Sequence, residues 1–83
     1  MAYSDLIHKG FLNCLIPNPN LIKTHLEWLL ADFDIKLTEQ TDSFVIFRLK
    51  SPDWLKNANY DKQVKFEFVK NDKLYHITNV IEF

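Results

Sequence analysis

Residues 64–81, with the sequence VKFEFVKNDKLYHITNVI, decide the fold because they encode two strands and the turn between them. Apolar Val64, Phe66 and Phe68 alternate with charged side chains, and a period of two residues is typical of a strand with one buried face. The turn contains two residues that tolerate the positive φ of tight hairpins, Asn71 and Asp72. The predicted elements are a strand over 64–70, a turn at 70–73 and a strand over 74–81.

Two further strands precede this hairpin. The hydrophobic period changes from about 3.6 to 2 after Asp34, so that residues 35–39 (IKLTE) alternate as a strand does. Residues 44–50 (FVIFRLK) are rich in β-branched and aromatic side chains, and residues 41–43 form a turn. Short connections favour antiparallel pairing. The core side of the sheet is expected to hold Ile35, Leu37, Val45, Phe47, Leu49, Phe66, Phe68, Tyr75, Ile77 and Ile81.

The residues before Asp34 have the period of helices. Ser4 can cap a first helix that runs to about Asn13, although Gly10 inside it costs about 1 kcal/mol of helix propensity relative to alanine. The apolar stripe of this region consists of Ile7, Phe11, Cys14 and Leu15.

A second helix is predicted over Pro19–Phe33. Asn18 is a favourable N-cap and Pro19 suits the first helical position. The core stripe of this helix consists of Ile22, Leu26, Leu29 and Phe33, and a second row beside it consists of Leu21, His25, Trp28 and Asp32. Trp28 has two interpretations: the first helix packs over its row, or the row faces a partner.

The segment 51–63 separates the two pairs of strands. Ser51-Pro52-Asp53 suits the start of a short helix near 52–58, and a loop follows it. We therefore predict one α+β domain over residues 1–83, in the order α-α-β-β-(short α)-β-β. Both N-terminal helices are expected on one face of a four-stranded antiparallel sheet.

Charge and composition are those of a soluble globular chain. Ten Lys and Arg oppose eleven Asp and Glu, a balance that argues against a nucleic-acid tail or a membrane-surface helix. No uninterrupted apolar run exceeds four residues, as in 44–47, whereas a membrane-spanning helix needs about 20. The single cysteine suits a reducing compartment, and no signal-peptide pattern is present. We expect a cytoplasmic protein, and the many Lys, Asn, Ile and Phe residues favour an AT-rich bacterial or phage genome.

No constellation of residues points to catalysis. Cys14 and His8 lie six positions apart, which turns them about 240° from each other on a helix, and a free cysteine is usually a buried structural residue. The histidines lack the short spacing of zinc ligands. Phosphate-binding loops need glycines, and Gly10 is the only one. We predict no enzymatic activity, cofactor or metal, with Cys14 as the one conceivable nucleophile.

The sheet face away from the helices is expected to mix apolar and cationic side chains, although a solvated face should be mostly polar. Two explanations stay open: segment 51–63 covers this face with Trp54, Leu55 and Tyr60, or a partner covers it. The expected face consists of Lys36, Thr38, Phe44, Ile46, Arg48, Lys65, Glu67, Leu74, His76 and Val80. The predicted contact set is Phe44, Ile46, Arg48, Trp54 and Tyr60, with Trp28 in reserve.

These features favour a small non-enzymatic protein-binding module. Such a protein acts by occupying the surface of a larger partner, as an inhibitor or accessory factor of phage or mobile-element type does. An exposed apolar sheet face or edge also favours a homodimer. The alternative function is single-stranded nucleic-acid binding through the outer sheet face, which the slightly acidic composition and the lack of an aromatic RNA-binding motif disfavour.

Overall fold

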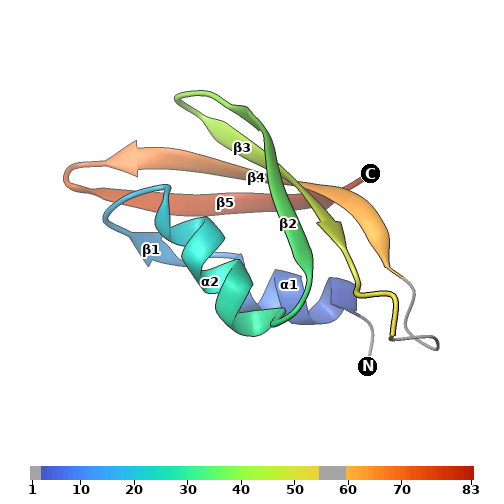
Figure 1. The fold of residues 1–83 in the computed structure, drawn as a ribbon. Coiled ribbons are helices and arrows are strands. Elements are labelled where there is room, and N and C mark those ends of the chain that lie inside the picture. The colour runs from blue at the N-terminus through green and yellow to red at the C-terminus, as the bar shows by residue number, and fades with distance from the viewer. Residues whose placement is uncertain (1–2, 55–59) are drawn as a thin grey trace.

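The computed structural model describes residues 3–54 and 60–83, with side chains from Asp5 onward in these ranges. It has an α+β fold with helices on one side of an antiparallel sheet, which confirms the predicted class (Figure 1). The elements in chain order are α1 (Tyr3–Phe11), β1 (Leu15–Ile16), α2 (Leu21–Leu29), β2 (Asp34–Gln40), β3 (Phe44–Lys50), β4 (Asp61–Asn71) and β5 (Leu74–Glu82).

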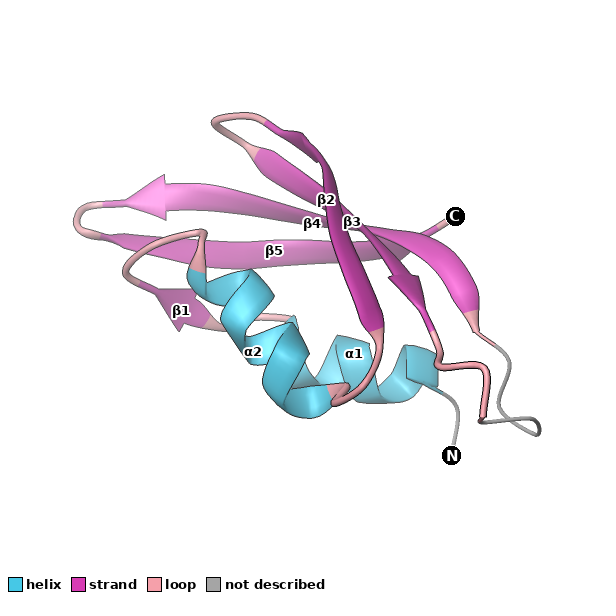
Figure 2. Ribbon diagram, in the orientation of Figure 1, coloured by secondary structure: helices cyan, strands magenta, loops and turns pink. Residues whose placement is uncertain are grey.

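The sheet has five strands rather than the predicted four, in the order β1-β5-β4-β3-β2 (Figure 2). The additional strand is β1, which lies antiparallel to β5. The Asn13 N–H donates to the Ile77 carbonyl and the Ile77 N–H donates to the Cys14 carbonyl, each at 2.9 Å. A strand of two residues is too short to show an alternating pattern, and the sequence therefore does not reveal it.

Both hairpin turns form where the sequence predicts them. The Thr41 hydroxyl accepts hydrogen bonds from the backbone N–H groups of Ser43 and Phe44, each at 3.2 Å, and so closes the turn between β2 and β3. Asp72, in the turn between β4 and β5, has a φ of 61°. That left-handed conformation is the one expected at this position.

Because of a bulge in β5, Val80 and Ile81 lie on the sheet faces opposite to those predicted. Thr78 has no pairing partner in β4, so β5 gains one extra residue there, and Ile77 and Val80 both face the core. Val80 is consequently 4% exposed, whereas Ile81 lies on the outer face and is 37% exposed.

Leu37 also differs from the prediction, which places it in the core. It pairs with the buried Phe47, yet it is 48% exposed. The cause is its position on β2, the last strand of the sheet, which has no neighbouring strand on its outer side.

The second helix is shorter at both ends than the predicted 19–33. The predicted Asn18 cap is wrong: the Asn18 Oδ1 accepts a hydrogen bond from the Asn20 N–H at 2.9 Å in the turn before the helix. The regular helix begins at Leu21, and its N-cap is Asn20, which makes no side-chain cap bond. Asp32 has a φ of 72°, a left-handed conformation that α-helix cannot contain.

The first helix ends at Phe11, before the predicted Asn13, because Asn13 has a φ of 66°. The predicted Ser4 hydroxyl cap lies outside the described side chains. A Cβ at Gly10 would lie 2.8 Å from the Leu29 Cδ1, so the glycine lets the two helices approach closely. No helix in the described part of the chain has the length and apolar character to span a membrane.

Side chains from both helices and the sheet form one core. The rings of Phe11 in α1 and Phe66 in β4 pack with 4.8 Å between centroids, and Phe47 in β3 lies 6.3 Å from Phe66. The buried apolar residues are Ile7, Phe11, Ile22, Leu26, Leu30, Val45, Phe47, Leu49, Tyr60, Val64, Phe66, Phe68, Ile77 and Val80.

Tyr60 belongs to this core and not to the surface, which corrects its place in the predicted contact set. It is 7% exposed, and its hydroxyl donates a hydrogen bond to the Glu82 carboxylate at 2.7 Å. The Tyr60 N–H donates to the Ser51 Oγ, and the Ser51 N–H donates to the Tyr60 carbonyl. Glu82 pairs with buried Val64, so this hydrogen bond lies on the core side of the sheet, and Tyr60 does not cover the outer face.

Tyr60→Phe tests the bond to Glu82. Burial raises the pKa of the Tyr60 phenol, and the hydrogen bond to the carboxylate raises it further. A raised folded-state pKa means that the stabilisation is complete below the unfolded pKa of about 10 and is lost as pH rises above it. We expect the free energy of unfolding, measured in urea at pH 7, to be about 1–3 kcal/mol larger for wild type than for Tyr60→Phe. This difference should shrink above pH ~10. A constant difference would contradict the assignment.

Val80→Ala and Ile81→Ala test the bulge. Removing the buried methyl groups of Val80 should cost about 2 kcal/mol, at roughly 0.8 kcal/mol per buried CH₂ plus a cavity term. Ile81→Ala should cost less because this side chain is partly solvated. Urea unfolding of both variants measures the order, and the reverse order would contradict the register.

Candidate protein-binding surfaces

The outer sheet face carries three of the predicted contact residues on β3. Phe44, Ile46 and Arg48 alternate with the buried Val45 and Phe47, so they project away from the core. Both helices lie on the other side of the sheet (Figure 1). The face therefore has no cover from the helices.

The cations of this face already have acidic partners. The Arg48 guanidinium donates two hydrogen bonds of 3.1 Å to the Asp61 carboxylate, which lower the pKa of that carboxyl group. The Lys65 Nζ lies 3.6 Å from the Glu67 carboxylate and 4.3 Å from the centroid of the Phe44 ring. Intramolecular pairing of this kind leaves few positive charges for an external phosphate chain.

Trp54 lies in the connection between β3 and β4 and is 66% exposed. The predicted short helix over 52–58 falls largely on residues 55–59, outside the described residues, as does Leu55. Residues 53–54 form a turn. The exposed indole of Trp54 has no ring partner among the aromatic pairs of the described residues.

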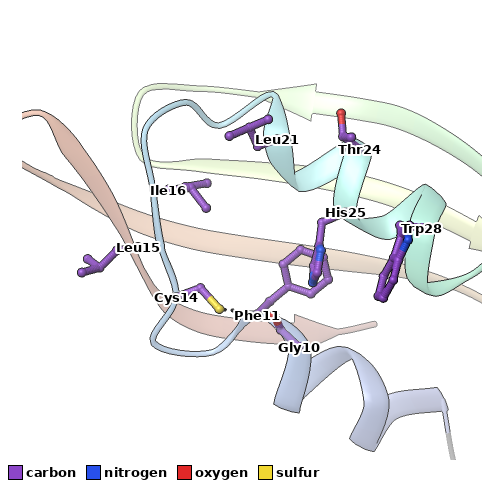
Figure 3. A pocket seen from close by; sticks show the side chains of 9 residues that line it. All are labelled: Gly10, Phe11, Cys14, Leu15, Ile16, Leu21, Thr24, His25 and Trp28. Atoms are coloured by element: carbon purple, nitrogen blue, oxygen red, sulfur yellow. Dashed lines mark hydrogen bonds between the residues drawn. The ribbon is translucent and has the colours of Figure 1, made fainter.

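A groove on the opposite side of the molecule collects apolar side chains from α1, β1 and α2. Its volume is about 420 Å³. Trp28 stands at its rim and is 77% exposed. The interpretation in which the first helix packs over the row of Leu21, His25 and Trp28 is therefore wrong. The groove residues are Gly10, Phe11, Cys14, Leu15, Ile16, Leu21, Thr24, His25 and Trp28 (Figure 3).

A series of aromatic contacts joins the exposed Trp28 to the core. The rings of His25 and Trp28 are within 12° of parallel, with 6.2 Å between centroids. His25 in turn meets the buried Phe11 edge to face at 4.9 Å (Figure 3). Because Phe11 is only 2% exposed, the His25 ring beside the Trp28 indole packs against a side chain of the core. An anchor that is oriented before binding loses less conformational entropy when a partner buries it.

Cys14 lies in the groove. Its thiol donates a hydrogen bond to the Gly10 carbonyl at 3.3 Å, and the neighbouring His25 ring packs against Phe11 and Trp28. Within residues 3–54 and 60–83, no three His, Cys, Asp or Glu side chains come together as metal ligands.

The predicted contact set is therefore divided. Phe44, Ile46 and Arg48 share the outer face, Trp54 lies in a loop, and Trp28 lies in the helix layer on the other side of the sheet. The sequence rows contained Leu21, His25 and Trp28 on one helix and Phe11, Cys14 and Leu15 on the other region. That the two rows border one groove could not be predicted, because β1 turns the chain away from α2.

No family model, curated protein or solved structure matches this chain.

Trp28→Ala and Trp54→Ala should leave stability almost unchanged. Both indoles are mainly exposed, and substitutions at such surface positions usually stay within about 0.5 kcal/mol. Urea unfolding at neutral pH measures the change. At a protein concentration low enough to keep both proteins monomeric, a loss above 2 kcal/mol for Trp28→Ala would show that this ring is needed for folding.

Proposed function

We propose that this chain is a small non-enzymatic protein-binding module that binds through Trp28 and the adjoining groove. The observation that carries the proposal is an oriented tryptophan, 77% exposed, at the rim of an apolar hollow of about 420 Å³. Trp28 is not among the core residues, so its large apolar ring is available for contact with a partner.

The energetics of interfaces support this choice of surface. Tryptophan is enriched among the few residues that dominate binding energy, and such residues enter well-packed pockets from which water is excluded. Burying a large apolar side chain contributes about 1.5–3 kcal/mol. Leu21, Phe11 and Ile16 extend the apolar surface around the indole.

Phe44, Ile46 and Arg48 form a secondary contact surface in this proposal. Phe44 and Ile46 are half-buried, and Arg48 is bound to Asp61. Their contribution to a protein interface is therefore smaller than that of Trp28. The outer face is also the surface required by the alternative function, single-stranded nucleic-acid binding.

Comparative capture tests the proposed function. The immobilised protein is exposed to lysate of the organism that encodes it, beside Trp28→Ala and Trp54→Ala, and retained proteins are identified by mass spectrometry. We expect at least one lysate protein to be retained by wild type and by Trp54→Ala but not by Trp28→Ala. Identical retention by Trp28→Ala would overturn the proposal, since Trp54→Ala controls for the loss of an exposed indole.

Salt dependence tests the nucleic-acid alternative. Because Arg48 and Lys65 have intramolecular acidic partners, we expect fluorescence anisotropy with labelled single-stranded DNA and RNA oligonucleotides to detect only weak binding, even at low salt. Phosphate contacts release counterions, so true nucleic-acid binding would be tight at low salt and would fall steeply as salt rises. That result would favour the alternative function.

A further inference from the structure

We propose that the groove binds a second copy of this chain, in a two-fold dimer where Trp28 of each copy enters the groove of the other. This inference rests on the proposed function, because it names the partner of the same surface. It specifies a geometry that the proposed function leaves open.

The first argument is that a protruding ring and a hollow lie side by side. In a two-fold interface both subunits use the same patch, which must therefore be complementary to itself. Trp28 supplies the protrusion, and the space between Phe11, Leu21 and Ile16 supplies the hollow (Figure 3). A surface that contains both meets the requirement without a second, different patch.

The second argument is charge. A two-fold axis brings residues close to their own copies, and facing like charges oppose association. The described residues that line the groove include no Lys, Arg, Asp or Glu. The patch therefore faces its own copy without like-charge repulsion.

The third argument is the spacing along α2. Leu21 and Trp28 are seven residues apart, which is about 10 Å along a helix. If the two α2 helices run antiparallel about an axis near Thr24 and His25, Leu21 of each copy lies opposite Trp28 of the other. Leu21 is 41% exposed, so it is accessible for this contact.

The edges of the sheet suit self-association less well. β2 carries the charged Asp34, Lys36 and Glu39 and is interrupted by a bulge at Thr38, features that discourage strand addition at an edge. At the opposite edge β1 has two residues and is followed by Pro17, which has no N–H to donate. The groove is thus the better surface for a second copy than either edge.

Sedimentation velocity and tryptophan fluorescence test the dimer. Trp54→Phe leaves Trp28 as the only tryptophan, so its emission reports directly on the groove. We expect a concentration-dependent dimer with a blue shift of the Trp28 emission. Trp28→Ala should weaken dimerisation about 30-fold or more, the size of a hot-spot loss, and Trp54→Ala should leave it unchanged. A monomer up to ~1 mM, or equal dimerisation by Trp28→Ala, would overturn the proposal.

A charge exchange at Thr24 tests the axis. Thr24→Glu and Thr24→Lys should each be monomeric, because the two copies of the new charge face one another across the axis. An equimolar mixture of the two variants should dimerise again, since opposite charges then meet. Thr24 is exposed on α2 and both new residues are good helix formers, so folding should persist and circular dichroism checks it. Undiminished dimerisation of each variant alone would overturn the two-fold geometry.

The outcomes separate this inference from the proposed function. A monomeric wild type whose Trp28 captures a different protein would overturn the second-copy proposal and keep the module. A wild-type dimer that Trp28→Ala does not form supports the proposal that the groove binds a second copy of this chain. If neither self-association nor capture of another protein depends on Trp28, both proposals fail.

Discussion

The packing of Phe11 against Phe66 is the contact on which the rest of the structure depends. Phe66 is fully buried in β4, the middle strand of the sheet, and Phe11 lies at the end of α1 with 4.8 Å between the ring centroids. This contact joins the helix layer to the centre of the sheet. It also supports His25, and through His25 it orients Trp28. The burial that stabilises the fold therefore also orients a side chain that contributes little to folding.

The groove follows from how the chain leaves α1. Asn13 adopts a left-handed conformation, and the chain then pairs with β5 as β1 instead of extending the helix over α2. Gly10 lets α1 approach Leu29, but both helices have only nine residues, and the row of Trp28 stays uncovered. A short helix pair thus encloses the core and leaves an apolar hollow at its side.

Several elements could be predicted from local pattern. The residues 44–50 form β3 within the predicted bounds, and the turns at Thr41 and Asp72 form as expected, because alternation and turn residues act over a few positions. The faces of Val80 and Ile81 could not be predicted, because one unpaired residue, Thr78, reverses the alternation after it. The Tyr60 hydroxyl finds its partner in Glu82, which lies 22 residues away in the chain, and local pattern could not reveal this contact.

The sequence by itself determined the α+β class, the antiparallel hairpins and the absence of glycine-rich phosphate loops, because these depend on residue type and short spacing. The tertiary structure alone decided which aromatic rings are accessible. Trp28 precedes the apolar Leu29 and Leu30, and Tyr60 stands between polar residues, yet Tyr60 is 7% and Trp28 77% exposed. That difference arises because burial depends on which distant element packs against a side chain: β5 supplies a partner for Tyr60, and α1 stops short of Trp28.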